Sequence, residues 1–514
     1  MTTYDDIPYP SYGYPQATPS AMSAIGQVFS LSPAGIEKAT VLEIGCASGG
    51  NIIPLAVQYP DATFVGVDLS ENQIAQANAL VAKLNLTNVT FIAGSIDEVE
   101  FPHETYDYIM AHGVFSWVPS FVQDAILKIC GERLSDNGLA YLSYNTLPGW
   151  NAVKTVRDMM LYHGQRFSDP AKKVREARQM LKFVADNLGS SSGAYKTLLE
   201  QEVKTLQNAD DNYLLHDHLE AINEPCYFHE FMSRANEAGL SYVGDSELPS
   251  MYLGNHSDKV KKTLAPMTNV IEQEQYLDFI SNRRFRMTVL TRKGHEIKRS
   301  ISSEVVKKLC LIPLFGITPD QPNDQELRIK RLKEPELIAT ISGEVAVGAY
   351  KEIINAFPKM LSFDQVFSRL EKKLDKSSEE IERDLSNLVV RFLFSGLLAA
   401  RADAAPIASE VNEKPEVFSY ARLQAEKQDV VTNLKHDQIK LKVDQRILLQ
   451  YLDGKNDAER IRKELLKHIA SGELNLNKNG DVVAADSPEI DTILKTYLDA
   501  QFGFFLRNSL LIEN

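Results

Sequence analysis

The chain has 514 residues, 44% of them hydrophobic and 24% charged, with a formal net charge of -14. This length exceeds what one hydrophobic core supports, so we expect about three to five structural units. A duplex-binding protein needs a basic face to displace counterions from phosphates, and the acidic balance therefore argues against a nucleic-acid partner.

The cysteines and the N-terminal segment indicate the compartment. The four cysteines lie far apart: Cys46, Cys130, Cys226 and Cys310. None belongs to a C-x-x-C pair, so we expect reduced thiols rather than a disulfide framework or a zinc site. Residues Met1–Pro15 are rich in tyrosine and proline and lack the apolar region of a signal peptide, and no apolar run approaches a membrane span. We predict a cytoplasmic protein with no membrane partner.

Strand and helix patterns alternate from Ala39 to Thr146. The strand-like runs are Ala39–Cys46, Thr63–Leu69, Val89–Ala93, Tyr106–Ala111 and Leu139–Tyr144, the last preceded by a turn at Asp136–Gly138. The helical patterns are Gly49–Gln58, a helix from the capping box Ser70-x-x-Gln73 to about Leu84, and Pro119–Cys130. This alternation predicts an α/β fold whose parallel sheet is built from right-handed βαβ units.

The strand signal stops after Trp150. Residues 151–224 are polar with helical periodicity, and we interpret them as a helical insertion that forms either a substrate lid or a dimer contact. A homodimer is therefore one of the predicted partners. A helix at Phe228–Ala238 and strands at Leu240–Val243 and Phe285–Thr291 indicate that the sheet resumes. We assign residues 1–150 and 225–293 to one domain.

The remainder of the chain is predicted to be mostly helical. Capping boxes at Ser362 and Ser377, followed by an apolar helix end and a strand-like tail, indicate a winged-helix-like unit at 294–403. Its predicted recognition helix carries Glu379, Glu380, Glu382 and Asp384, which would repel phosphate, so a structural or protein-binding role is favoured over DNA binding. Residues 404–415 form a linker to a final unit at 416–514.

A glycine-containing turn follows the first strand. The run from Glu43 to Asn51 reads E-x-G-x-A-x-G-G-N and opens a helix, whose N-terminus can approach a ligand. Asp68 ends the second strand, where an acid can bind ribose hydroxyls. The turn is not the G-x-G-x-x-G of dinucleotide enzymes, and Glu43 suits a ligand that carries an ammonium group. These features favour S-adenosylmethionine over a nicotinamide dinucleotide.

This arrangement resembles the class I S-adenosylmethionine-dependent methyltransferases, whose domain is Rossmann-like. Further segments resemble bacterial methyltransferases with a methyltransferase regulatory domain, a group that includes the rickettsial lysine methyltransferases acting on outer-membrane proteins. The segments are Asp6–Pro15, Gly49–Ala56, His112–Pro119, Ser143–Trp150 and His216–Phe231. Ala47 departs from the family, which usually has glycine there. Because alanine still permits negative φ, the departure bears on the fine geometry of the turn more than on cofactor binding.

The resemblance implies a cofactor site. Glu43, Gly45 and Gly49 should line the methionine and ribose side, Asp68 should hold the ribose, and Ser95 with Ile96 should flank the adenine. The full set of predicted cofactor contacts is Glu43, Gly45, Cys46, Gly49, Asn51, Asp68, Leu69, Gln73, Ser95, Ile96 and His112.

The segment His112–Trp117 follows the fourth strand, where this family meets its methyl acceptor. The predicted acceptor-side residues are Trp117, His112, Tyr144, Asn145, Tyr9 and Tyr12, with Tyr14 as a further aromatic candidate. The N-terminal tyrosines should cap the site. His216, His218, Cys226 and His229 could ligate a metal, but a structural polar cluster is favoured, and we predict no metal.

Three functions are compatible with these residues. The first is methylation of lysine side chains in a protein substrate, with a surface or outer-membrane protein before export as the candidate. The second is methylation of a small molecule by the same cofactor domain. The third is an adaptor that only senses S-adenosylmethionine.

Overall fold

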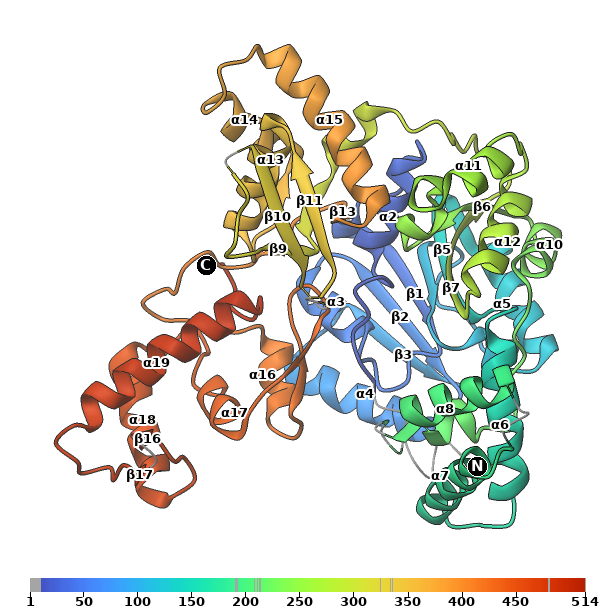
Figure 1. Cartoon of the computed structure of the whole chain (residues 1–514). Helices are drawn as coiled ribbons and strands as arrows, with labels where there is room; N and C mark the ends of the chain where they lie inside the picture. The colour runs from blue at the N-terminus through green and yellow to red at the C-terminus, as the bar shows by residue number, and fades with distance from the viewer. Residues whose placement is uncertain are drawn as a thin grey trace.

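A seven-stranded mixed sheet forms the centre of the protein (Figure 1). The computed structural model describes residues 11–189, 193–207, 209, 211, 214–323, 325–332, 334, 336–478 and 481–513. The sheet order is β3-β2-β1-β4-β5-β7-β6, in which the first five strands are parallel and β7 is antiparallel to both of its neighbours. The strands are β1 (Thr40–Ile44), β2 (Thr63–Asp68), β3 (Val89–Ala93), β4 (Tyr106–Ala111), β5 (Leu134–Asn145), β6 (Leu240–Asp245) and β7 (Phe285–Arg292).

Hydrophobic side chains cover both faces of this sheet, as expected for buried parallel strands. Neighbouring residues along a strand join different cores: Val41 of β1 faces one core, and Leu42 faces the other. The first core includes residues of α2 (Pro19–Val28), α3 (Ile52–Gln58) and α4 (Glu71–Leu84), and the second includes residues of α5 (Ser120–Arg133) and α10 (Phe228–Glu237). Two further helices, α11 (Asp258–Leu264) and α12 (Val270–Ser281), precede β7.

Most sequence-based element boundaries agree with the structure to within three residues, and two differences change the local structure at β5 and after β1. Val89–Ala93 and Tyr106–Ala111 are confirmed as strands, and Ser70 caps α4 by accepting a hydrogen bond from the Gln73 N–H at 3.2 Å. The turn expected at Asp136–Gly138 does not separate two elements. It lies inside β5 as a bulge, in which residues 135–138 stand opposite Asp107 alone.

The helix expected from Gly49 begins three residues later, at Ile52. Gly49 has φ +79°, in the left-handed region, and its N–H bonds to the Cys46 carbonyl in a turn. Residues Cys46–Asn51 therefore form a loop between the carboxyl end of β1 and the start of the helix.

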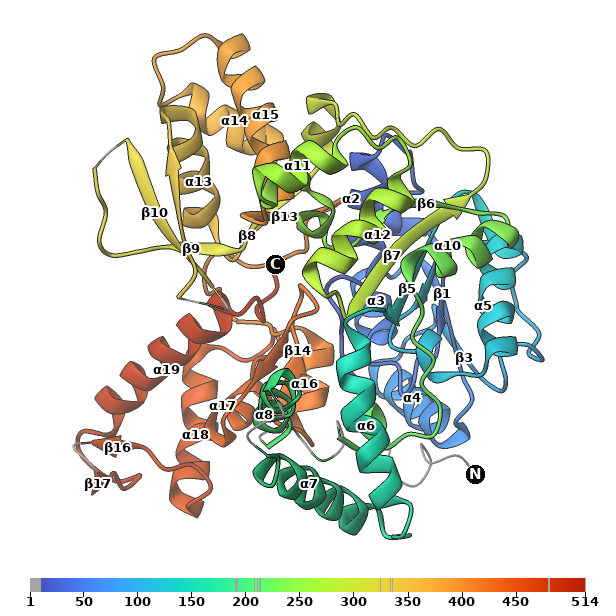
Figure 2. The ribbon, with the colours of Figure 1, turned by 45° about the vertical axis from the view of Figure 1, so that its right-hand side comes forward.

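The predicted helical insertion has its own core. Helices α6 (Trp150–Gly164), α7 (Pro170–Asp186) and α8 (Gly193–Gln207) bury a separate set of leucines, valines and alanines. The π-helical segment η4 (Leu214–His218) packs against α6 and α7. Both views place these helices beside the end of the central sheet that lies towards the bottom of the picture (Figures 1 and 2).

The C-terminal part contains small sheets and helices in two groups. The capping box at Ser362 is confirmed, and Ser377 caps α15. The first group comprises β8 (Cys310–Pro313), β9 (Phe315–Ile317), β10 (Glu326–Arg331), β11 (Ile338–Ser342), α13 (Glu344–Ala356), β12 (Leu361–Ser362), α14 (Phe363–Glu371), α15 (Ser378–Ser395) and β13 (Leu398–Arg401). The second comprises α16 (Ser419–Ala425), β14 (Val430–Thr432), β15 (Gln438–Lys440), α17 (Val443–Leu449), α18 (Ala458–Ser471), β16 (Asn477–Lys478), β17 (Asp481–Val482) and α19 (Ile490–Arg507).

Part of the expected linker at 404–415 packs against the rest of the protein. Ile407 and Ala408 are buried, and Ile407 pairs with Ile512 in a β-bridge. One continuous hydrophobic cluster runs from the central sheet through both C-terminal groups. The domain boundaries derived from the sequence therefore stay a prediction.

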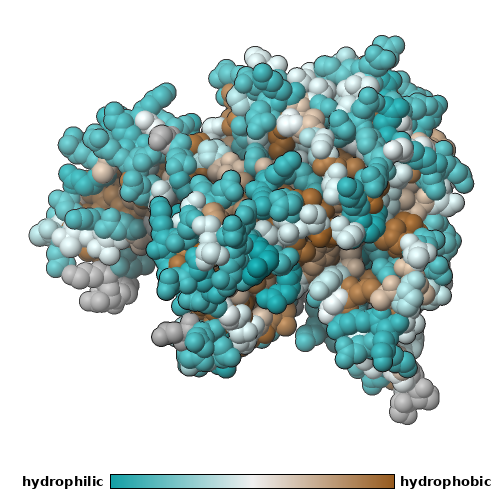
Figure 3. Space-filling model, turned by 90° about the horizontal axis from the view of Figure 1, so that it is seen from above, coloured by the Kyte–Doolittle hydropathy of each residue, from teal (hydrophilic) through white to brown (hydrophobic). Residues whose placement is uncertain are grey.

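The surface seen in Figure 3 is mainly hydrophilic, and its hydrophobic residues gather in small areas between polar ones. Across the described part of the chain, no helix has both the length and the apolar character that crossing a bilayer requires.

Candidate functional site

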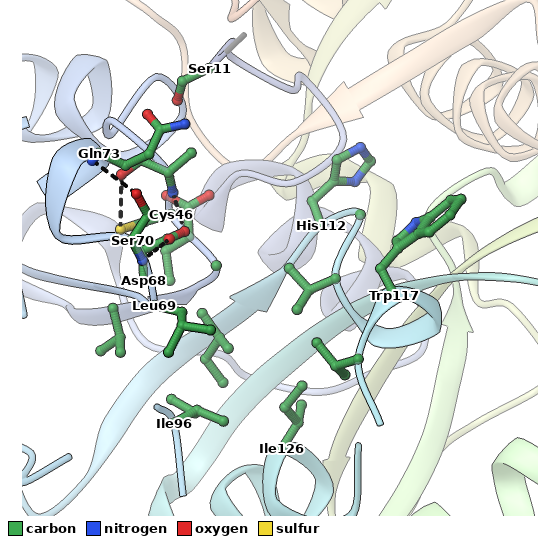
Figure 4. Close-up of a pocket in the computed structure, with 18 of the residues that line it drawn as sticks. Ser11, Cys46, Asp68, Leu69, Ser70, Gln73, Ile96, His112, Trp117 and Ile126 are labelled. Carbon is green, nitrogen blue, oxygen red and sulfur yellow. Dashed lines mark hydrogen bonds between the residues drawn. The ribbon is translucent and has the colours of Figure 1, made fainter. Parts of the chain in front are cut away.

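A cavity of about 400 Å³ opens at the carboxyl ends of the parallel strands. Open α/β sheets bind their ligands at this edge. The ends of β1 and β2 and the loop after β3 line one side, while the loop after β4, Asn145 of β5 and Phe285 of β7 line the other. Figure 4 shows this division, with Asp68, Ser70 and Gln73 on one side and His112 and Trp117 on the other.

The turn after β1 needs left-handed backbone conformations. Gly45 has φ +70°, and a Cβ there would lie 2.3 Å from Val114 Cγ2. Ala47 has φ +47°, so alanine occupies a conformation that L residues with a side chain disfavour by roughly 1–2 kcal/mol. Alanine permits a negative φ, but the structure holds this departure from the family pattern at a positive one. The Ala47 N–H donates to Asp68 Oδ2 at 2.8 Å, which holds the turn in place.

Glu43 presents a carboxylate oxygen to the cavity. Asn51 Nδ2 donates to Glu43 Oε1 at 2.9 Å, while Glu43 Oε2 is buried with no hydrogen-bond partner among the residues that the structure describes. Burial raises the pKa of Glu43 to about 8, although the hydrogen bond from Asn51 opposes this rise. An unsatisfied buried oxygen is costly, and a ligand ammonium group would satisfy it. Glu43 therefore fits the amino group of S-adenosylmethionine.

Asp68 and its neighbours fit the nucleoside part of the same cofactor. The Asp68 carboxylate accepts the Ala47 N–H and, at 2.9 Å, the Ser70 N–H, which fixes its orientation at the end of β2. Leu69 lines the cavity with 59% of its surface exposed, and Ile96 lies on the same side. Apolar side chains beside an oriented carboxylate, one exposed (Leu69) and one buried (Ile96), suit a flat base and a ribose.

Asn51 connects the cofactor turn to two distant parts of the chain. Its Oδ1 accepts the Tyr14 N–H at 2.9 Å, and its carbonyl lies 3.3 Å from Nε2 of His436 in the C-terminal part. The Gly50 N–H donates to Ser11 Oγ at 2.7 Å. The N-terminal segment therefore lies directly on the turn, held between the cofactor domain and the C-terminal part.

Two tyrosines of the N-terminal arm lie at the cavity. Tyr12 and Tyr14 line the cavity, and the Tyr14 ring lies 3.9 Å from the His112 ring, centroid to centroid. Tyr9 lies outside the described residues. The arm thus contributes aromatic surface to the side of the cavity away from Asp68.

His112 and Trp117 form the wall opposite the cofactor turn. His112 Nδ1 lies 2.8 Å from the Tyr141 hydroxyl, and burial lowers the pKa of His112 to about 4, so the ring is neutral. Trp117, in the short helix η2 (Phe115–Trp117), is half-buried and packs edge-to-face on Trp150 with centroids 6.3 Å apart. The Arg157 guanidinium lies 5.7 Å from the Trp117 ring.

Two predicted contacts do not line the cavity. Tyr144 points to the other face of the sheet, where its ring stacks on Phe231 at 4.1 Å and its hydroxyl lies 3.0 Å from Thr288 Oγ1. Successive strand residues face opposite sides, so Asn145 lines the cavity and Tyr144 belongs to the core. Gly49 shapes the turn: a Cβ there would meet Ile53 and Phe91.

The other predicted contacts do line the cavity: Glu43, Gly45, Cys46, Asn51, Asp68, Leu69, Gln73, Ser95, Ile96, His112, Trp117, Asn145 and Tyr12. Sequence reasoning missed Ser11, His216, Asp217 and Phe285 as lining residues. His216 and Asp217 lie in the segment His216–Phe231, which resembles the family. The sequence singled out His216 only as a possible metal ligand and gave Asp217 no role. Among the described residues, no three His, Cys, Asp or Glu side chains form a metal-binding group.

The lining, as far as the structure describes it, offers carboxyl groups and no cationic side chain, and Glu43 ionises when an ammonium group binds. Glu43, Asp68 and Asp217 are acidic, and no lysine or arginine belongs to the part of the lining that the structure describes. S-adenosylmethionine carries a sulfonium and an ammonium group, so an acidic cavity suits it.

Comparisons with known proteins agree with this geometry. Residues 41–138 match a methyltransferase domain, residues 210–292 a predicted methyltransferase regulatory domain, and residues 413–510 the PKMT C-terminal winged helix domain. This last match lies C-terminal to residues 294–403, where the sequence had indicated a winged-helix-like unit. With the cavity and its Glu43 and Asp68 carboxylates, the fold defines an S-adenosylmethionine-dependent methyltransferase.

Two relatives match almost the whole chain. The protein RP789 of Rickettsia prowazekii strain Madrid E is 38% identical over 523 residues, covering 99% of this chain and 93% of its own. PKMT2 from Rickettsia typhi has the same fold, with a TM-score of 0.88, 30% identity and coverage of 98% of this chain and 100% of that one. PKMT2 is also known in complex with AdoHcy, at 31% identity to this chain. The chain belongs to this family of methyltransferases with a regulatory and a PKMT winged helix domain.

The pKa of Glu43 predicts a pH dependence of cofactor binding. Without cofactor, a pKa of about 8 leaves Glu43 mostly protonated at pH 7, whereas a bound ammonium group favours the carboxylate and lowers this pKa. Binding therefore releases a proton, so affinity should rise nearly tenfold from pH 6 to pH 7. Calorimetry in two buffers of different ionisation enthalpy should show nearly one proton released at pH 7.

The control is Glu43→Gln, which keeps the size of the side chain and removes its titration. This variant should bind more weakly and with an affinity that does not change over the same pH range. A wild-type protein that releases no proton would contradict the assignment of Glu43 to the cofactor ammonium group.

Proposed function

We propose that this enzyme transfers the methyl group of S-adenosylmethionine to lysine side chains of a protein. The observation that carries the proposal is the acidic lining of the cavity, in which Asp217 adds a third carboxylate away from the cofactor turn. A cationic acceptor is attracted to such a cavity, whereas an acidic one is repelled. The likeness to PKMT2 over the whole chain supports the same acceptor class.

The side of the cavity beyond the cofactor fits an alkylammonium chain. Trp117, Tyr12, Tyr14 and Phe285 supply aromatic surface, and aromatic faces attract alkylammonium groups by about 0.5–2 kcal/mol. The same rings exclude water, which favours the neutral amine over the ammonium form. When bound, S-adenosylmethionine supplies an electrophilic methyl group on a sulfonium sulfur. The chain then has to hold the amine in line with that carbon, so positioning supplies much of the rate.

The acceptor lysine must first lose a proton. With a reference pKa of about 10.4, forming the neutral amine at pH 7 costs roughly 4–5 kcal/mol. We place this reaction in the cytoplasm, where the four free cysteines would stay reduced.

The test follows a labelled methyl group from S-adenosylmethionine into extracted envelope proteins. Acid hydrolysis should release labelled methyllysine, and the same proteins with acetylated amines should take up little label. Label found only in the small-molecule fraction would mean a small acceptor. Cofactor binding without transfer to any fraction would mean a sensor.

Trp117→Ala should lower turnover by about 2- to 30-fold, the range of one cation–π contact, while cofactor affinity stays within about threefold. Trp117 lies across the cavity from Asp68, so it should act on the acceptor rather than on the cofactor. Its half-buried side chain should leave the melting temperature nearly unchanged. Kinetics, calorimetry and thermal unfolding of one preparation measure all three.

Trp117→Phe is the matched control, because it keeps an aromatic face and should retain most of the turnover. A strongly lowered melting temperature of Trp117→Ala would mean that Trp117 packs the fold, and the acceptor contact would then rest on Asn145.

A further inference from the structure

Asp217 comes from a part of the chain that supplies none of the predicted cofactor contacts. It lies in η4, between His216 and His218, at the end of the helical insertion. The flanking side chains Leu215, His216 and His218 are buried, whereas Asp217 lines the cavity. The insertion thus places one carboxylate in the cavity that the sheet builds.

One oxygen of this carboxylate has no hydrogen-bond donor among the described residues. Asp217 Oδ2 is buried and makes no hydrogen bond to any residue that the structure describes. Leaving a buried charged oxygen unsatisfied costs more than about 1–3 kcal/mol, so an unpaired oxygen on a side chain that lines a cavity indicates a donor that arrives with a ligand. Burial raises the pKa of Asp217 to about 7, although the nearby Arg157 opposes this rise.

The neighbours of Asp217 place it at the acceptor side. Its charge contributes to raising the pKa of Tyr14, after burial and Glu43, and the Tyr14 ring contacts the His112 ring in a tilted arrangement. Arg157, which acts on Asp217, also lies over the Trp117 ring. The cofactor carboxylates Glu43 and Asp68 come instead from the ends of β1 and β2.

We propose that Asp217 binds the ammonium group of the acceptor lysine and accepts its proton before methyl transfer, an inference that rests on the proposed lysine acceptor. The Asp217 carboxylate becomes a carboxylic acid and the lysine becomes a neutral amine. The amine lone pair then forms the N–C bond, the C–S bond breaks, and its electron pair passes to sulfur.

The charged groups around Asp217 allow this role. Arg157 of α6 favours the carboxylate form but donates through Nη2 to the Glu220 carbonyl, so the guanidinium is held by the backbone. Lys173 of α7 donates to the Leu219 carbonyl at 3.2 Å. Burial lowers the pKa of His218 to about 4, so this neighbour is neutral at pH 7.

The experiment compares Asp217→Asn with wild type at saturating cofactor, where Glu43 is held ionised. The probe is labelled S-adenosylmethionine with extracted envelope proteins, and methyllysine is measured from pH 6 to pH 9. Loss of a general base should lower kcat/KM at pH 7 by about 100- to 10,000-fold. Wild-type activity should level off above about pH 8, whereas activity of the variant should keep rising about tenfold per pH unit, because only hydroxide then forms the neutral amine.

Two further variants separate a chemical role from a structural one. Asp217→Glu should restore part of the rate and the wild-type pH profile. Asp211→Asn removes an exposed carboxylate of the same region, paired with Arg178 at 2.7 Å, and should behave like wild type. Cofactor affinity and melting temperature of Asp217→Asn should stay close to wild type.

The outcomes distinguish the two proposals. If wild type forms no methyllysine, the proposed function fails and this inference fails with it. If wild type forms methyllysine and Asp217→Asn does so at an equal rate with an unchanged pH profile, Asp217 has no part in proton transfer and only this inference is overturned.

Discussion

Asp68→Ala should weaken S-adenosylmethionine binding by at least about 100-fold. The Asp68 carboxylate is oriented by the N–H groups of Ala47 and Ser70 and faces the cavity at the end of β2. Two ribose hydroxyls would each lose a charge-assisted hydrogen bond worth about 1.5–3 kcal/mol, or roughly 3–6 kcal/mol together. The fold should survive, because Asp68 lies at the end of a strand whose pairing the substitution leaves in place. Calorimetry measures the affinity, and circular dichroism checks the fold.

Glu71→Ala is the matched control. Glu71 is an exposed acid three residues further along, in the first turn of α4, and it does not line the cavity. It should bind the cofactor like wild type. An Asp68→Ala protein with an affinity within threefold of wild type would show that this carboxylate does not hold the ribose.

Arg286→Ala should lower the free energy of unfolding by about 3–5 kcal/mol, the cost of breaking a buried ion pair. Arg286 of β7 is 0% exposed and donates to Glu274 at 3.0 Å and to Asp278 at 2.8 Å. Although burial disfavours the charged guanidinium, Glu274, Tyr242 and Asp278 raise the pKa of Arg286 above its ordinary value. The substitution would leave buried carboxylates without their cation and loosen α12 from the sheet.

Arg292→Ala, at the other end of the same strand, is the control. Arg292 pairs with Asp136 at 3.5 Å, with side chains 42% and 96% exposed, and such surface pairs contribute about 0–1 kcal/mol. Urea unfolding compares the two variants, and hydrogen exchange of peptides from α12 and β7 shows where protection is lost. Equal effects of both substitutions would contradict the network role.

Much of the sheet could be predicted because its signals are local. The periodicity of β3 and β4 and the cap at Ser70 are set by residues within a few positions of one another. The bulge in β5 was missed, since a strand continues through Asp136–Gly138 only because β4 pairs on both sides of it. The positive φ of Ala47 has a similar cause: the bond from its N–H to Asp68 supports a backbone conformation that alanine alone disfavours.

In the candidate site, too, some positions follow from local sequence signals and others depend on tertiary contacts. Glu43 and Asp68 lie in the last two residues of β1 and β2, and Trp117 lies in the loop segment that follows β4. The α/β pattern therefore places all three at the ligand-binding edge from the sequence. Tyr144 and Asn145 are adjacent, and the sequence could not say which of them faces the cavity. The structure decides it, because one side chain packs on Phe231 and the other lines the cavity.

The sequence by itself determined the order and type of the elements of the sheet and the position of Glu43 and Asp68 at its ligand-binding edge, because spacing along one chain segment fixes them. The tertiary structure decided which distant segments complete the site: the arm at Ser11–Tyr14, His436 behind Asn51, and Asp217 from the helical insertion. The burial of Asp217, the resulting rise of its pKa and the lack of a hydrogen-bond partner for its Oδ2 atom among the described residues depend on packing between elements far apart in sequence. Hydrophobic burial and long-range contacts set these properties, and no local pattern encodes them.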